Sequence, residues 1–260
     1  KPTGFGRFAL YQQISDQEEL SKDEEIAWER VVHRYEKVAE ACYKRGMALL
    51  VDAEEPWMQK AADDLVEQLM EKYNKEKAVV YGTLQLYRHD RFDYLKGLHA
   101  KAQDRGYKIG MKLVRGAYME KERERAEELG YRSPICDDKL STDENFNQVL
   151  RYAFDHLDDI SIFCGTHNEK SSYLLMDLIA ESGISKNDPR IWFGQLFGMS
   201  DNISFNLAHE GYNVAKYLPF GPVKDVMPYL IRRAEENTSV AGQTNRELDL
   251  IVKEKKRRKV

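Results

Sequence analysis

Six short apolar runs, each followed by a longer amphipathic stretch, constrain the fold of this chain more than any other feature. Most of the runs are continuously apolar rather than alternating, which is typical of strands buried on both faces of a parallel sheet. The chain is therefore predicted to be an α/β protein with helices covering a parallel sheet. The expected strands are residues 47–52, 78–83, 107–114, 160–164, 190–197 and 213–218. The expected helices are residues 23–44, 55–73, 91–104, 120–129, 143–156, 170–182, 206–210 and 223–237.

Polar residues near the carboxyl end of every expected strand favour a barrel over an open sheet. An open, doubly wound sheet gathers its site at one switch point, whereas a barrel brings all strand ends into one ring. The polar residues are Asp52, Gln85, Lys112, Arg115, Tyr118, Thr166, His167, Gln195 and Tyr217. Six strands are fewer than the eight of a complete barrel. We therefore expect the first part of the barrel to lie upstream of this chain, with Lys1 at a strand end.

Length and composition narrow the possible functions. A chain of 260 residues fits one large domain, expected over residues 1–260. Its net charge of −4 gives no field that would attract nucleic acid. No run of about 18 apolar residues predicts a transmembrane helix. The three cysteines, Cys42, Cys136 and Cys164, lie far apart, and the histidines form no metal-binding motif, so a metal is not expected.

Six motifs in the chain resemble those of proline dehydrogenases and occur in the same order. They are residues 51–55 (VDAEE), 112–118 (KLVRGAY), 166–168 (THN), 193–199 (FGQLFGM), 217–221 (YLPFG) and 229–237 (YLIRRAEEN). The resemblance runs from residue 1 to about residue 237 and is stronger to monofunctional enzymes, including the mitochondrial type, than to bifunctional ones.

The resemblance implies both a fold and an activity. The fold would be a distorted (β/α)8 TIM-type barrel, here without its first strand, first helix and most of the second strand. FAD would lie at its carboxyl-terminal face, and a last helix would cover the active site. The activity would be oxidation of L-proline to pyrroline-5-carboxylate, the first step of proline catabolism. Hydride would pass from C5 to the flavin, and electrons would then pass to a quinone.

Two adjacent arginines, Arg232 and Arg233, are the clearest candidates for binding a carboxylate, because guanidinium groups bind carboxylates in a planar, bidentate geometry. Read alone, such a pair is more often part of a solvated helix face. The resemblance implies that they bind the proline carboxylate. It also implies that tyrosine at the position of Tyr217 packs on the proline ring, which favours proline over hydroxyproline. The implied substrate-binding residues are Lys1, Leu196, Tyr217, Tyr229, Arg232, Arg233 and Glu236.

Lys112 lies within an apolar run, where a buried lysine needs a partner or a task. It could form a structural ion pair with Asp52 or act as a Schiff-base lysine. The resemblance implies instead that Lys112 contacts the flavin, in a position where many bacterial relatives carry arginine. Asp52 could cap a helix, while the resemblance implies that it orients basic groups of the active site. Asp52 and Lys112 are thus the expected catalytic residues.

The implied FAD-binding residues surround these two positions. Small residues allow the backbone to approach a cofactor, and hydroxyl, imidazole and amide groups can bind its polar parts. The set is Ala53, Gln85, Lys112, Arg115, Gly116, Ala117, Tyr118, Thr166, His167, Asn168 and Gln195.

Other functions and partners stay open at this point. The alternatives are a hydroxyproline dehydrogenase, a folate-linked flavin reductase, a Schiff-base aldolase and a barrel that binds a carboxylate without catalysis. Expected partners are L-proline, a membrane quinone and another fragment of the same polypeptide that completes the barrel. The expected location is bacterial cytoplasm with peripheral inner-membrane association, or the matrix side of the mitochondrial inner membrane. The basic residues 253–259 are either a solvated helix end or an element attracted to an anionic membrane.

Overall fold

The computed structural model describes the chain except for residues 225, 228, 232, 234–240, 259 and 260, and in 241–250 it describes only the Leu248 side chain. The chain divides into two compact units, Lys1–Lys216 and Tyr217–Val260. Each unit is described by itself.

A parallel sheet of six strands forms the centre of the fold, which confirms the predicted strands. The strands are β1 (Leu49–Leu50), β2 (Val80–Gln85), β3 (Ile109–Val114), β4 (Ile160–Gly165), β5 (Ile191–Leu196) and β6 (Val214–Tyr217). Their order in space is the same as their order in the chain. A doubly wound sheet reverses its strand order at a switch point, whereas a barrel adds each strand beside the previous one. The curled sheet is therefore a part of a (β/α)8-type barrel.

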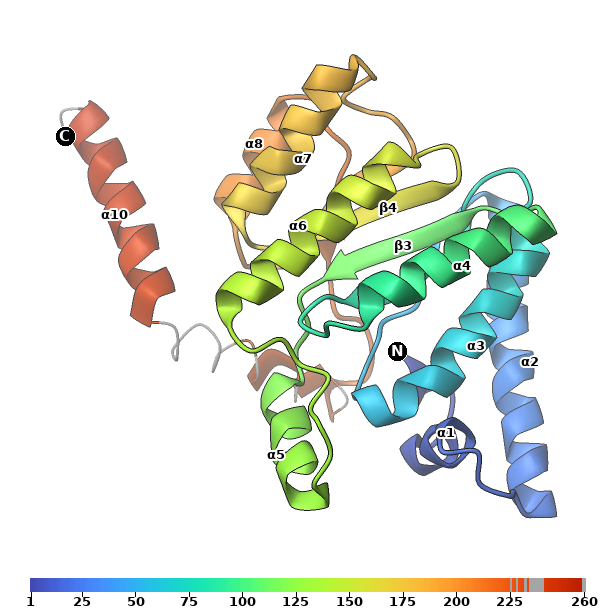
Figure 1. Ribbon diagram of the computed structural model, residues 1–260. Helices are drawn as coiled ribbons and strands as arrows, with labels where there is room; N and C mark the ends of the chain where they lie inside the picture. Colours follow the sequence, from blue (N-terminus) through green and yellow to red (C-terminus); the bar gives the residue numbers. More distant parts are fainter. Residues whose placement is uncertain (225, 228, 232, 234–240, 259–260) are drawn as a thin grey trace. The chain divides into compact units, whose positions relative to one another are not determined.

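Helices connect the strands and cover one face of the sheet; α3, α4 and α6 lie side by side along it (Figure 1). This follows from the strand order, because successive right-handed crossovers in one direction place every helix on the same side. The first unit contains η1 (Pro2–Gly4), α1 (Phe8–Ser15), α2 (Lys22–Arg45), α3 (Pro56–Tyr73), α4 (Arg91–Arg105), α5 (Met119–Leu129), α6 (Lys139–Asp155), α7 (Glu169–Ser182) and α8 (Asp201–His209).

The ends of α2 show how local sequence defines these helices. Ser21 caps its first turn, and Glu24 accepts a hydrogen bond from the Ser21 backbone amide at 2.8 Å, which completes a capping box. The helix ends at Gly46, whose φ of 65° lies in the left-handed region that suits glycine. The helical spacing of apolar residues predicted this helix, at residues 23–44, to within one residue at each end.

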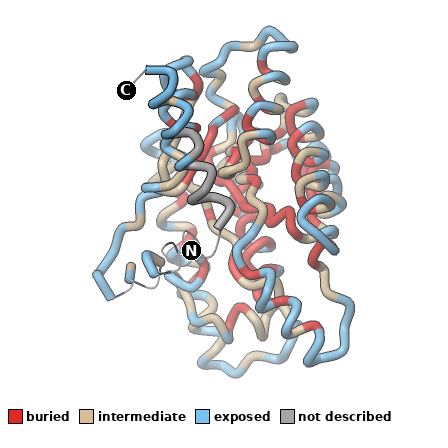
Figure 2. Tube along the Cα trace, turned by 90° about the vertical axis from the view of Figure 1, so that its left-hand side faces the viewer, coloured by how far each residue is buried: buried red, intermediate tan, exposed pale blue. Residues whose placement is uncertain are grey.

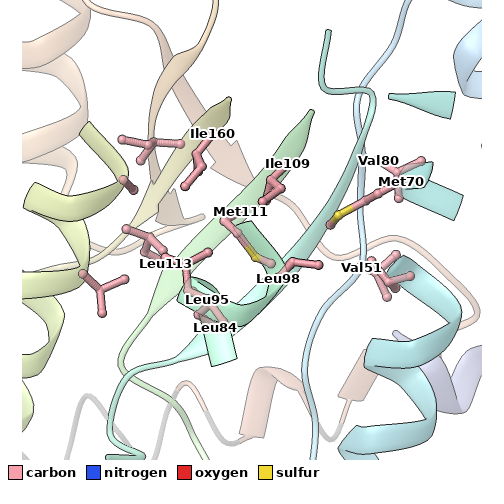
Figure 3. Close-up of a cluster of buried hydrophobic side chains, with 14 of the residues drawn as sticks. Val51, Met70, Val80, Leu84, Leu95, Leu98, Ile109, Met111, Leu113 and Ile160 are labelled. Atoms are coloured by element: carbon pink, nitrogen blue, oxygen red, sulfur yellow. The ribbon is translucent and has the colours of Figure 1, made fainter. Parts of the chain in front are cut away.

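The main core lies between the sheet and these helices. Buried residues follow the strands and the inward sides of the helices (Figure 2). Leu84 and Met111 from the sheet lie close to Leu95 and Leu98 of α4 (Figure 3). Because side chains alternate along a strand, the opposite face of β2 and β3 carries the residues between these. That face is the one that holds the candidate site.

The second unit contains α10 (Ala241–Arg258), which was not predicted. The helix predicted at 223–237 is helical at its described residues between 223 and 233, and residues 234–237 lie outside the described part.

Candidate functional site

An ion pair between Asp52 and Lys112 lies on the face of the sheet opposite the covering helices, which we call the inner face. Lys112 Nζ donates to Asp52 Oδ1 at 2.6 Å, and the two side chains are only 15% and 18% exposed, respectively. Lys112 pairs in register with Thr83 of β2 and Phe163 of β4, so these side chains share one face. Asp52 does not cap a helix, since α3 begins at Pro56 with Glu55 at its N-cap. The ion pair with Asp52, which was one of the alternatives for Lys112, is therefore observed.

The Asp52 carboxylate stays charged in spite of its burial. Burial is the largest influence and pushes its pKa upward, but the charge and hydrogen bond of Lys112, with a smaller contribution from Lys1, lower the pKa below its usual value. The inner face thus holds a fixed negative and a fixed positive charge side by side.

Lys1 reaches this end of the sheet through a buried carboxylate that sequence reasoning missed. Lys1 Nζ lies 3.8 Å from Glu54 Oε1 and donates to Tyr118 Oη at 3.3 Å. Glu54 is 5% exposed and accepts two further hydrogen bonds from Thr3, one from the amide and one from the hydroxyl, both at 2.9 Å. In the sequence Glu54 looks like a first-turn helix charge, and only its contact with a distant segment shows otherwise. The structure therefore brings two predicted substrate and cofactor residues, Lys1 and Tyr118, together.

Gln85 ends β2 beside the same segment. Its Nε2 donates to the Glu54 carbonyl oxygen at 2.8 Å, and the Glu54 amide donates to Gln59 Oε1 at 2.9 Å. These bonds fix the backbone that follows Asp52, including the predicted cofactor residue Ala53.

Arg115, at the end of β3, joins four elements through one guanidinium group. Nε donates to Asp143 Oδ1 at 2.7 Å, Nη1 to Thr166 Oγ1 at 2.8 Å and Nη2 to Ser171 Oγ at 3.0 Å. The group also lies over the Phe146 ring, 4.5 Å from its centroid. Arg115 thus holds the loops after β3 and β4 against α6 and α7.

We expect Arg115→Lys to lower the free energy of unfolding by about 2 kcal/mol, because lysine keeps the charge but cannot bond three acceptors in one plane. Urea unfolding would measure this. Arg151→Lys is the matched control, since Arg151 is exposed on α6 and makes no ion pair among the described residues. Equal stability of the two variants would remove Arg115 from this structural role.

Gly116 follows Arg115 and cannot carry a side chain. Its φ is 128°, and a Cβ atom there would lie 1.3 Å from Cε1 of the Tyr87 ring. This glycine is therefore required by the packing of the loop, whether or not a cofactor approaches it. Ala117 is exposed in the same loop, and Tyr118 is largely buried.

Gln195 ties the end of β5 to the neighbouring loop. Its Nε2 donates to the Thr166 carbonyl oxygen at 3.2 Å, and its Oε1 accepts from Ser204 Oγ at 2.9 Å. Leu196 follows it at the end of β5 and is half-buried. Gln195 thus positions the loop that carries the THN motif.

His167 and Asn168 complete that loop. His167 Nδ1 lies 2.9 Å from Ser200 Oγ, while Asn168 caps α7 by accepting from the Ser171 amide at 3.2 Å. The first three polar groups of the loop, Thr166, His167 and Asn168, therefore lie together at the end of β4.

Lys216 on β6 is a second residue that sequence reasoning missed. Its Nζ donates to the Met199 carbonyl oxygen at 2.7 Å and forms an ion pair with Asp201 at 2.7 Å. It holds the loop between β5 and α8, which contains Ser200. A lysine within a short predicted strand indicates a side chain that needs a partner, but nothing in the sequence identified the partners of Lys216.

The remaining predicted substrate residues lie in the second unit. The Tyr217 and Tyr229 rings are 5.7 Å apart, and the Arg233 guanidinium lies 5.0 Å from the centroid of the Tyr229 ring. Three of the predicted substrate residues thus form one cluster. Arg232 and Glu236 lie outside the described residues.

The described part of the chain lacks two further kinds of feature, a metal-binding cluster and a membrane-spanning helix. No group of three or more His, Cys, Asp or Glu residues in it could hold a metal ion. None of its helices has the length and apolarity needed to cross a membrane.

The fold and the site define a class of protein. A parallel sheet wound in one direction, with charged and amide side chains at the carboxyl ends of its strands, is typical of (β/α)8-barrel enzymes. The family model for proline dehydrogenase matches residues 7–246. The chain belongs to the proline dehydrogenase family.

Two relatives that are named proline dehydrogenase agree with this assignment. The chain is 38% identical to "Proline dehydrogenase 1, mitochondrial" of Caenorhabditis elegans over 92% of its length, and 37% identical to the Homo sapiens protein of that name over 89%. It spans only 40% and 39% of those two relatives. It is also 36% identical, over 100% of its length and 67% of the relative, to "Carbapenem antibiotics biosynthesis protein CarD" of Pectobacterium carotovorum.

A solved structure supports the fold. Proline utilization A from Bdellovibrio bacteriovorus, inactivated by N-propargylglycine, superposes with a TM-score of 0.75 and 26% identity. The match covers 84% of this chain and 22% of that one. The predicted barrel-type fold is therefore confirmed.

Proposed function

We propose that this chain is the catalytic barrel of a proline dehydrogenase that oxidises L-proline to pyrroline-5-carboxylate. The observation that carries the proposal is the buried Asp52–Lys112 pair on the inner face, at the carboxyl ends of the strands, in a member of this family. Barrel enzymes place their reacting groups at this end.

The residues at this end of the sheet fit FAD as the cofactor. The donor set combines the Lys112 ammonium, the Gln85 amide and the His167 imidazole, from the ends of three neighbouring strands. Such groups suit a planar heterocycle with carbonyl oxygens and ring nitrogens. When bound, FAD supplies the acceptor for the hydride that leaves C5 of proline.

Within this proposal the chain positions groups and supplies charge. Lys112 provides a fixed positive charge where negative charge develops, which stabilises the transition state because the charge is already oriented. Asp52 holds the Lys112 ammonium in place through the 2.6 Å hydrogen bond. Arg115, Gly116, Ala117, Tyr118, Thr166, His167, Asn168, Gln195 and Ala53 are the further residues proposed for the cofactor site.

For the substrate, we propose that Arg232 and Arg233 bind the carboxylate, that Glu236 orients them, and that Lys1 adds a third positive charge. Tyr217 and Tyr229 would pack on the proline ring together with Leu196. The tyrosine at position 217 favours proline over hydroxyproline, which is the second candidate substrate.

The acceptor and the location are part of the same proposal. We propose a membrane quinone as electron acceptor and a location on the matrix side of the mitochondrial inner membrane. The mitochondrial names of several relatives support the mitochondrial part of this proposal. A further fragment of the polypeptide is proposed to complete the barrel. In support, β1 and β6 each have one neighbour in the described sheet.

The test is an anaerobic visible spectrum of the purified full-length protein before and after addition of L-proline. We expect flavin absorption bands that bleach with L-proline. Bands that persist with L-proline but bleach with hydroxyproline would favour the second candidate. A colourless protein that binds proline would contradict catalysis, and borohydride trapping of a substrate would indicate an aldolase.

A further inference from the structure

Thr83 is a buried polar residue on the inner face, beside the Asp52–Lys112 pair. It lies on β2, is 5% exposed and pairs in register with Lys112 of β3. Asp52 follows β1, and β2 lies between β1 and β3 in the sheet. The ion pair therefore spans the strand on which Thr83 lies. A buried hydroxyl group is costly unless it forms a hydrogen bond, so the partner of this hydroxyl indicates what Thr83 does.

The Thr83 hydroxyl binds the peptide group that leads into Asp52. Its Oγ1 donates to the Val51 carbonyl oxygen at 2.7 Å. That oxygen and the Asp52 amide belong to one planar peptide group, so the hydrogen bond fixes the plane from which the Asp52 side chain starts. A hydroxyl group has a single hydrogen to donate. Because Thr83 gives its hydrogen to Val51, it does not compete with Lys112 for the Asp52 carboxylate.

Two side chains of β2 hold the segment after β1 at both of its ends. Thr83 donates to the Val51 carbonyl oxygen, and Gln85 Nε2 donates to the Glu54 carbonyl oxygen at 2.8 Å. Side chains two residues apart lie on the same face of a strand, so both donors lie on the inner face. The paired residues of β1 end two positions before Asp52. Beyond that point, the position of Asp52 depends on these side-chain hydrogen bonds from β2.

The ion pair is sensitive to the position of this segment. Lys112 Nζ and Asp52 Oδ1 are 2.6 Å apart, and charge-assisted hydrogen bonds form only over a narrow range of distances. A displacement of the carboxylate by about 1 Å would lengthen the contact to about 3.6 Å, which is no longer a hydrogen bond. The Lys112 ammonium would then lose its fixed place. Displacements of this size can slow a reaction by about 100-fold, even when the substituted residue lies away from the reacting atoms.

We propose that Thr83 is a positioning residue for the oxidation of proline: its hydroxyl fixes the Val51–Asp52 peptide, and the Asp52 carboxylate then holds the Lys112 ammonium where negative charge develops. This role rests on the proposed function of Lys112. Thr83 acts through the ion pair alone and touches neither substrate nor cofactor in this scheme. A threonine with a purely structural task would stabilise the sheet without affecting the charge state of Asp52.

The experiment compares full-length enzymes that carry Thr83→Val, Thr83→Ala and Thr83→Ser. Valine has the shape of threonine without its hydroxyl, whereas serine keeps the hydroxyl. Thr83→Val should slow flavin reduction by saturating L-proline about tenfold. It should change the Michaelis constant for L-proline by less than about twofold, because Lys112 is not proposed to bind the substrate. Thr83→Ser should stay within about twofold of the wild type in both quantities. Thr83→Ala should act like Thr83→Val, which covers the case that valine prevents folding.

A second measurement does not depend on turnover. Burial raises the pKa of Asp52, but the charge and hydrogen bond of Lys112, with a smaller contribution from Lys1, bring that pKa below its usual value. In carbon-13 NMR of protein labelled at the aspartate carboxyl carbons, the Asp52 signal is the one that Asp52→Asn removes. This signal should titrate at a higher pH in Thr83→Val than in the wild type, because a weakened ion pair favours the protonated acid. In Thr83→Ser it should titrate as in the wild type.

Thr142→Val is the matched control. Thr142 is 7% exposed, and its Oγ1 donates to the Asp138 carbonyl oxygen at 2.9 Å. The substitution therefore removes a similar buried hydrogen bond from α6, and it should leave the titration of Asp52 unchanged.

Three results would overturn the proposal. They are an unchanged Asp52 titration in Thr83→Val and Thr83→Ala, a shifted titration without slower flavin reduction, and equal effects of valine and serine at position 83. If L-proline does not reduce the flavin of the wild-type enzyme, the proposed oxidation itself fails. The titration of Asp52 would still decide whether Thr83 positions the ion pair, so the two failures can be told apart.

Discussion

Lys112→Met should lower the free energy of unfolding by about 3 to 5 kcal/mol at about pH 7, because it leaves the Asp52 carboxylate buried without its partner. The effect should shrink as the pH falls. The pKa of Asp52 is below its usual value in the folded protein, so its ion pair stabilises the fold above the unfolded pKa and is lost as the pH falls through the folded one. Urea unfolding at about pH 7 and at a pH below 3.8, the ordinary pKa of an aspartate, would measure both results.

Two comparisons separate this expectation from a general effect of losing lysine. In the double variant Asp52→Asn/Lys112→Met no charge is left buried, so it should recover part of the lost stability. Lys108→Met breaks a more exposed pair, with Asp159 at 2.9 Å, and should cost about 1 kcal/mol or less. If Lys112→Met lowers the free energy of unfolding no more than Lys108→Met does, the Asp52–Lys112 pair is not the buried ion pair described here. If the proposed function holds, Lys112→Met should also slow flavin bleaching by about 100- to 1,000-fold.

Arg232→Ala should raise the Michaelis constant for L-proline by about 100-fold or more, because a bidentate guanidinium–carboxylate contact is lost. The measurement is initial rate against proline concentration with the full-length enzyme. Pyrrolidine, which has the ring but no carboxylate, is the matched probe, and its weak turnover should change little. An unchanged Michaelis constant for proline would remove Arg232 from the carboxylate site. Arg151→Ala, at an exposed position of α6, controls for loss of an arginine.

The strands could be predicted because buried parallel strands have a simple sequence pattern. Even so, β2 runs to Gln85, two residues beyond its predicted end. The prediction ended this strand at the polar Thr83, whereas the backbone pairing with β3 continues through Leu84 and Gln85. A polar residue that ends a strand at a functional face is invisible to an apolar pattern.

Helix α1 was missed and α8 was predicted too short, and both helices lack a side-chain cap at the N-terminus. Helix α1 has only eight residues and no side-chain cap. Helix α8 begins after Ser200, which has a φ of 51° and also makes no capping hydrogen bond. By contrast, α6 does have a signal that was overlooked: Asp138 and Ser141 form a reciprocal cap that starts the helix four residues earlier than predicted.

A site residue could be predicted where its residue type was unusual for its position in the sequence. It could not be predicted where its residue type was common at such a position. Lys112 in an apolar run indicated a buried partner, and Asp52 is that partner. Glu54 resembled a common helix-start charge, so its burial against Thr3 and Lys1 could not be inferred. That contact joins segments 51 residues apart, and only the folded chain shows it.

Three of the loops at the carboxyl ends of the strands are each held by a side chain from the strand beside them. Gln85 of β2 bonds to the segment after β1, Gln195 of β5 to the loop after β4, and Lys216 of β6 to the loop after β5. Substitutions in adjacent loops should therefore interact energetically, while those in loops further apart around the sheet should simply add. An engineer who wishes to reshape one loop would need to redesign it together with its neighbouring strand, as a pair.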